Sequence, residues 1–124
     1  FSIWHPESDL YIMDLTTGTT KNLENVNSSD VDSYHTWSSS GHWFVFSSKR
    51  MDGLWARPYI AAFNPETGET GKAFLLPQKD PMFYDNYTYT YNRPELIKTA
   101  VKNGKEFEKI IQQAAIPSTP KKIR

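Results

Sequence analysis

The 124-residue sequence contains no cysteine, carries no net charge and lacks a long apolar run. Without cysteine, the chain has no disulfides, thiolate zinc sites, iron–sulfur clusters or thiol nucleophile. Fourteen basic residues balance fourteen acidic ones, so no global field draws the chain toward a phosphate backbone, and nucleic acid is not an expected partner. No stretch approaches the roughly twenty apolar residues that span a bilayer, so no membrane span is expected in this chain.

Aromatic residues are abundant instead, and they lie in short runs beside Ser, Thr and Gly. They form 15% of the chain, which is typical of packed strands. Residues 9–15 are predicted to form a largely buried strand, in which Leu10 and Ile12 alternate with Tyr11, Met13 and Leu15, and TTGTT turns the chain into a short returning strand at 21–23. A second hairpin spans 34–50 around SSSG, after a polar stretch, 25–33, that is predicted to be an exposed connection. With a further strand over 57–63 that ends at NPETG, the sequence predicts an all-β fold of antiparallel strands.

Two parts of the chain resemble each other at a spacing of about fifty residues. YIMDLTTGT, starting at Tyr11, aligns with YIAAFNPETGE, starting at Tyr59, at an offset of 48. Gly18 then falls opposite Gly68 if two residues are inserted in the second turn. The first two residues align with the Phe-Ser pair at 46–47, so the chain is expected to open at the end of a strand.

A four-stranded antiparallel unit that recurs every 40 to 50 residues or so is the pattern of β-propeller blades. The sequence therefore predicts a truncated blade over 1–33 and a complete blade over 34–77. One and a half blades cannot close a ring, so further blades or a protein partner are expected to cover the open faces. Beyond the repeat we expect an aromatic capping segment over 78–94, short helices over 95–115 and a flexible basic tail over 116–124.

The stretch HTWSSSGHWFVFSSKR, followed by RPYIAAFNPETGE, resembles the repeat of TolB-like, WD40-like propellers of the PD40 type. Trp37, Ser38 and Gly41 match the Trp-Ser-Pro-Asp-Gly turn of such repeats, whereas Ser39 and Ser40 depart from its Pro and Asp. The chain is also similar to the C-terminal end of propeller proteins common in Bacteroidetes. The resemblance implies a periplasmic or cell-envelope location, but such repeats indicate fold better than function.

Three tyrosines are the candidate ligand-binding residues. Tyr87, Tyr89 and Tyr91 share one face if YTYTY is extended, and tyrosine rings suit stacking on a sugar. Candidate carboxylates around them are Asp80, Asp85 and Glu95. The alternative interpretation is that the aromatic residues pack over the outer edge of the last blade.

The histidines and serines form no pattern of a catalytic or metal site. His5, His35 and His42 lack the i, i+4 spacing of a helical metal pair. SSSG lies in a hairpin, whereas a serine nucleophile of the GxSxG type needs a strand-to-helix turn. No catalytic residue, metal ligand or cofactor is therefore predicted.

Two functional hypotheses remain. The first is a non-enzymatic propeller segment in the cell envelope, acting as a protein-interaction or ligand-binding scaffold, with glycan as one candidate ligand. The alternative is an accessory or gating portion of a glycan-processing enzyme or peptidase, whose catalytic residues lie mostly outside this chain.

Overall fold

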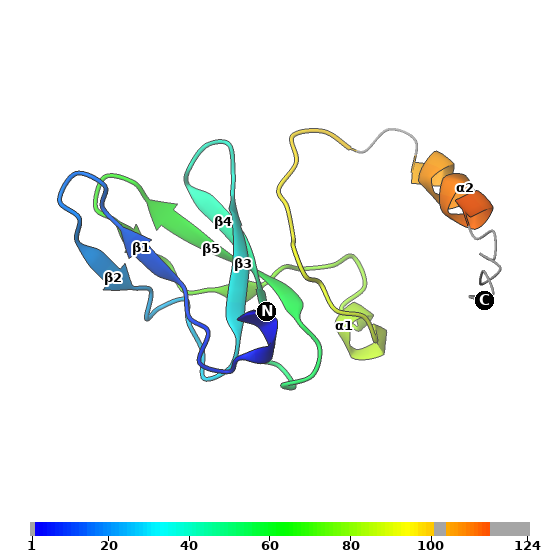
Figure 1. Ribbon diagram of the computed structural model, residues 1–124, viewed down its shortest axis with the longest axis horizontal. Helices are drawn as coiled ribbons and strands as arrows, with labels where there is room; N and C mark the ends of the chain where they lie inside the picture. Colours follow the sequence, from blue (N-terminus) through cyan, green and yellow to red (C-terminus); the bar gives the residue numbers. More distant parts are fainter. Residues whose placement is uncertain (1, 101–103, 115–124) are drawn as a thin grey trace, which may run out of the picture.

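The structure, a computed structural model, describes residues 2–100 and 104–114. These residues form two antiparallel β-sheets and three helices (Figure 1). The small sheet is the hairpin of β1 (Tyr11–Met13) and β2 (Thr20–Asn22). The large sheet contains β3 (Asp32–Trp37), β4 (Trp43–Ser48), β5 (Arg57–Asn64), β6 (Glu69–Thr70) and β7 (Phe74–Leu75). The helices are η1 (Ser2–Trp4), α1 (Phe83–Asn86) and α2 (Gly104–Ala114). The predicted all-β, antiparallel class is confirmed.

The large sheet is a meander in the order β3-β4-β5-β6, and β7 also pairs with β5. β6 pairs with the end of β5, and β7 pairs with Tyr59 and Ile60 nearer its start. The two short strands thus follow one edge of β5 in succession. The predicted SSSG turn joins β3 to β4, where the Gly41 N–H donates to the Ser38 C=O at 3.0 Å.

The two faces of the large sheet are covered differently. We call the face formed by Phe44, Phe46, Tyr59, Ala61 and Phe63 the front face. It packs against the β1–β2 hairpin, and Leu10, Ile12 and Leu23 join it in one apolar core. Burial of Phe44 or Phe46 in this core contributes about 1.5–3 kcal/mol each. Because side chains alternate along a strand, the opposite back face carries Trp43, Val45, Ser47, Ile60 and Ala62.

The turns of β1–β2 and β5–β6 repeat the same hydrogen bonds. The Gly18 N–H donates to the Asp14 C=O at 2.8 Å, and the Gly68 N–H donates to the Asn64 C=O at 2.8 Å. In each turn the Asp or Asn Oδ1 also accepts the N–H two residues further on, at 2.8 and 2.9 Å. Both glycines have positive φ, 72° and 69°, which other residues rarely adopt.

These turns define an offset of 50 residues between the two hairpins. The pair Met13 and Thr20 in the small sheet takes the same place, relative to its turn, as the pair Phe63 and Thr70 in the large sheet. No insertion is needed. The predicted alignment of the two Tyr-Ile pairs at an offset of 48 was therefore wrong. Cross-strand pairing and the turn set the correspondence between the two hairpins, whereas similar residue types alone do not.

The described part of the chain begins with the helix η1, so Ser2 is not the end of a strand, and residue 1 lies outside the described residues. The His5 N–H donates to the Ser2 C=O at 3.0 Å. Ile3 packs with Val31 and Ala56 in a second, smaller apolar cluster. At Ser2 the expected strand end was wrong, because coiling at this point buries Ile3 in the cluster.

Residues 25–33, which connect the sheets and enter β3 at Asp32, are buried or half-buried except for Asn25 and Ser29. Val26 and Val31 lie in the two apolar clusters. The Asn27 Oδ1 accepts from the Leu10 N–H, and its Nδ2 donates to the Leu10 C=O, both at 2.9 Å. The prediction of an exposed loop was wrong, because polar groups that are paired inside a protein are buried at little cost.

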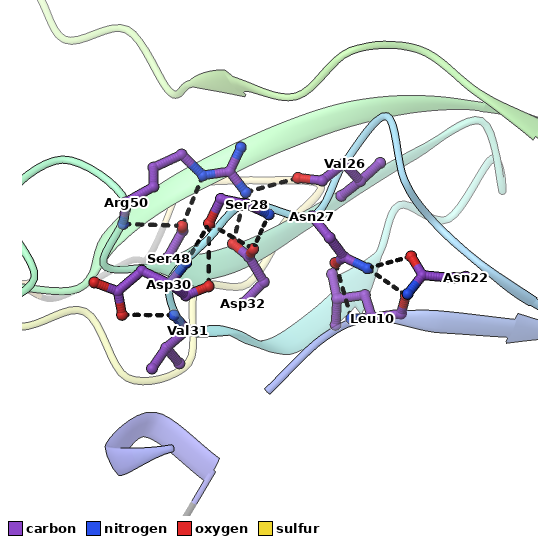
Figure 2. A network of polar contacts seen from close by, with 10 residues as sticks. All are labelled: Leu10, Asn22, Val26, Asn27, Ser28, Asp30, Val31, Asp32, Ser48 and Arg50. Carbon is purple, nitrogen blue, oxygen red and sulfur yellow. Dashed lines mark hydrogen bonds and ion pairs between the residues drawn. The ribbon is translucent and has the colours of Figure 1, made fainter. Parts of the chain in front are cut away.

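A buried ion pair ties this connection to the large sheet (Figure 2). The fully buried Asp32 carboxylate accepts from Arg50 Nη2 at 2.6 Å and from the N–H and O–H of Ser28 at 2.6 and 2.8 Å. Arg50 also donates to the Ser48 Oγ at 2.8 Å and to the Val26 C=O at 2.7 Å. One guanidinium therefore joins a loop to the end of β4.

Residues 95–100 are not helical, contrary to the prediction. Leu96 and Ile97 line a groove on the large sheet, and so short a helix would be marginal by itself. α2 lies within the stretch where helical spacing predicts short helices, and Figure 1 draws it apart from the sheets. No helix in the described part of the chain is long and apolar enough to cross a membrane. The tail predicted over 116–124 lies outside the described residues.

Candidate functional site

Residues 78–94, the aromatic segment, are anchored to the large sheet by Arg57. This arginine is buried at the start of β5. It donates from Nη1 to the Tyr89 C=O and from Nη2 to the Tyr84 C=O, both at 3.1 Å. Two carbonyl groups of the segment thus accept from the two Nη atoms of a buried guanidinium, which holds the segment against the sheet.

Further hydrogen bonds fix the segment at both ends. On the back face, the Ser47 Oγ donates to the Tyr91 C=O. The Tyr84 hydroxyl donates to the Leu76 C=O at 2.7 Å and accepts from the Gln78 Nε2 at 2.8 Å. Burial raises the pKa of Tyr84, because the phenolate is disfavoured away from water. The segment therefore covers the end of the back face that carries Ser47.

The three predicted tyrosines lie together in this segment. The Tyr87 ring centroid lies 5.3 Å from that of Tyr89 and 5.2 Å from that of Tyr91. Phe83 also stacks on Tyr87, at 4.9 Å. Since Tyr87 is stacked against two neighbours and Tyr89 is 68% exposed, a ligand that stacks on this cluster would meet the Tyr89 ring.

The hydroxyl of Tyr91 is the most perturbed titrating group in the cluster. Burial raises the pKa of Tyr91 to about 12, with further contributions from the neighbouring Tyr87 and Tyr84 hydroxyls. At neutral pH the phenol is therefore protonated. It offers a hydrogen bond, and it is not a base.

The candidate carboxylates do not join the tyrosines in one site. Asp80 Oδ1 accepts from the Met82 N–H at 3.0 Å, and Asp85 is exposed on α1. Glu95 lines a separate polar groove of about 410 Å³. Within residues 2–100 and 104–114, no three His, Asp or Glu side chains gather closely enough to hold a metal ion.

The three histidines occupy different surroundings. His5 lies 3.4 Å from Glu7 at the surface. His35 is exposed on β3 and lines the polar groove with Glu95, and His42 is exposed beside the SSSG turn. They do not form one site.

A β-bulge at Tyr34 was not predicted. The register between β3 and β4 shifts between Ser33 and Thr36, and Tyr34 has a φ of 54°. The Arg93 guanidinium lies 5.6 Å from the Tyr34 ring, beside the polar groove. Such a conformation costs a bulky residue about 1–3 kcal/mol, and bulges re-aim side chains. No Gly or Pro marks this position, so the sequence gives no signal for it.

The rest of the back face forms an apolar groove of about 530 Å³. Its walls include Trp43, Ile60 and Phe74 of the sheet, with Leu96 and Ile97 of the following chain. Trp43 is 41% exposed and Phe74 is 48% exposed. We call this surface the back-face groove.

The second apolar surface is the outer side of the β1–β2 hairpin. Leu10 and Ile12 point toward the large sheet, whereas Tyr11 is 58% exposed and Met13 is 55% exposed. The alternation in the sequence carried this signal, because it predicts one apolar row on each side of the strand.

No protein-family model, curated protein or solved structure matches the chain. The described residues form antiparallel β-sheets with a few short helices.

Proposed function

We propose that the chain is a segment of a TolB-like β-propeller array and serves as a non-enzymatic scaffold that binds a protein or another ligand in the cell envelope. The observation that carries the proposal is that the β1–β2 hairpin packs on a sheet that contains an equivalent hairpin, β5–β6, at an offset of 50 residues. Propellers are built by stacking small antiparallel sheets face to face. The proposed location rests on the resemblance of the Trp37 to Gly41 turn to TolB-like repeats.

A scaffold needs a rigid frame with free surfaces. The main core and the ion pair between Asp32 and Arg50 supply the frame. The back-face groove and the outer side of the β1–β2 hairpin are free, and exposed apolar patches of this kind are typical of interaction sites.

Photo-crosslinking in the cells that make the protein tests this proposal. A benzoylphenylalanine in place of Phe74 lies in the back-face groove. The same group in place of Leu54, which is exposed in the loop before β5, is the matched control. We expect a discrete adduct from position 74, in the envelope fraction, and none from position 54. No adduct from position 74, or the same adducts from both positions, would contradict the proposal.

A second candidate function is glycan binding at Tyr89. The observation in its favour is the exposed Tyr89 ring on a cluster of stacked aromatic residues, a surface suited to the apolar face of a sugar. Glycan-array binding that is lost in Tyr89→Ala tests it.

A further inference from the structure

We infer that a second copy of this chain binds head to tail, with the outer side of its β1–β2 hairpin seated on the back-face groove of the first copy. The inference deepens the proposed function and rests on one part of it, namely that the repeated units are built to stack. It names the partner, the two surfaces and the polarity of the contact.

The offset of 50 makes positions of the two hairpin units equivalent. Leu10 and Ile12 of the first unit correspond to Ile60 and Ala62 of the second. Tyr11 correspondingly matches Ala61, and Met13 matches Phe63. Each unit therefore has two distinguishable sides, one for each row of side chains on its strand.

The contact inside the chain uses unlike sides. Leu10 and Ile12 of the first unit pack against the side of the second unit that carries Ala61 and Phe63. This contact is heterologous, because it joins the inner side of one unit to the front face of the next. Heterologous contacts do not saturate themselves, and they leave one free surface of each kind at the ends.

Both free surfaces are present on this chain. The side of the second unit equivalent to Leu10 and Ile12 is the back face with Ile60, where the groove remains open. The side of the first unit equivalent to the front face carries Tyr11 and Met13, both more than half exposed. A second copy that repeats the internal contact joins these two surfaces and continues the established packing.

The side chains on the two surfaces suit each other. The groove is apolar, with Trp43 and Phe74 on its walls. The hairpin offers Met13, whose flexible thioether adapts to aromatic walls, and Tyr11, which combines an apolar ring with a polar tip.

Light scattering coupled to gel filtration tests the inference on the complete chain. We expect the mass of the unaltered protein to rise with concentration to two or more copies. Met13→Glu should remove the hairpin surface and Phe74→Glu the groove surface, because each buries a charge in the contact and weakens it at least about tenfold. Leu54→Glu, an apolar-to-acidic change at an exposed position outside both surfaces, should associate like the unaltered protein.

Mixing the two variants gives the decisive result. Met13→Glu keeps an intact groove and Phe74→Glu keeps an intact hairpin, so an equimolar mixture should form a one-to-one dimer and nothing larger. Circular dichroism confirms that each variant is folded, and Tyr11→Glu or Trp43→Glu replaces a variant that is not.

Three results would overturn the inference. The first is an unaltered protein that stays monomeric at about 1 mM, a concentration at which even a Kd of about 1 mM would give a detectable dimer. The others are a single variant that associates by itself and a mixture of the two variants that stays monomeric. A discrete adduct to a different protein in the crosslinking experiment would then leave the proposed function standing and remove self-association alone.

Discussion

Replacing Arg50 by methionine should lower the free energy of unfolding by about 3–5 kcal/mol, because it breaks a buried ion pair from one side. Methionine fills similar space but leaves the fully buried Asp32 carboxylate without its partner at 2.6 Å. The change also removes the donors to Ser48 and Val26 and the guanidinium that lies 4.5 Å from the Tyr59 ring. Since small domains unfold with about 5–15 kcal/mol, the variant should lose at least about a fifth of its stability.

The double variant Asp32→Asn/Arg50→Met separates the buried charge from the lost contacts. An asparagine oxygen still accepts the hydrogen bonds of Ser28, and no unpaired charge remains. The double variant should therefore be more stable than Arg50→Met alone, by about 1–3 kcal/mol. Urea unfolding followed by the fluorescence of Trp37 and Trp43 measures both. A loss below about 1 kcal/mol for Arg50→Met, or a double variant less stable than the single one, would refute the reasoning.

Three further experiments address the repeat, the tyrosine cluster and the glycan candidate. Gly18→Ala and Gly68→Ala should each cost about 1 kcal/mol in urea unfolding, because both φ values are positive and no atom within 4 Å meets the added Cβ; clearly unequal losses would contradict the equivalence of the two turns. The pKa of Tyr91 is raised to about 12 in the fold and is about 10 in an unfolded chain, so its contribution to stability is complete below about pH 10 and is lost as the pH rises toward about 12. As the pH rises across this range, the urea midpoint of Tyr91→Phe should therefore fall less steeply than that of the unaltered protein. Parallel pH curves for the two proteins would contradict a raised pKa of Tyr91. Tyr89→Ala should abolish glycan binding and leave the melting temperature unchanged, since the ring is exposed; a lower melting temperature would instead indicate a packing role.

Local signals explain the part of the fold that the sequence predicted. Alternating apolar residues and the turns at SSSG and NPETG identified the hairpins, because a strand period of two and a glycine with positive φ act within a few residues. Gly18 and Gly68 were matched correctly for this reason. The tyrosines were also found by a local pattern, and the structure brings their rings together.

Contacts between distant residues explain what the sequence did not predict. Residues 25–33 are polar, and their burial depends on Arg50 of another hairpin and on the backbone of Leu10. The extended course of residues 95–100 depends on the groove that Leu96 and Ile97 line, although their spacing alone is helical. The bulge at Tyr34 has no marker residue, so pattern reasoning could not place it.

The packing of hairpin on sheet depends on apolar contact more than on charge, and this bears on how copies of the chain would join. Lys21 and Glu69 link the two hairpins at 2.8 Å, but both side chains are more than half exposed, so the pair contributes about 0–1 kcal/mol and is screened by salt. Leu10 and Leu23 are buried in the same contact and contribute about 1.5–3 kcal/mol each. A head-to-tail contact that repeats this packing should therefore persist in about 1 M salt, where the Debye length falls to about 3 Å. Association that disappears under these conditions would point to a contact led by charge, for example through Lys98, which lines the groove.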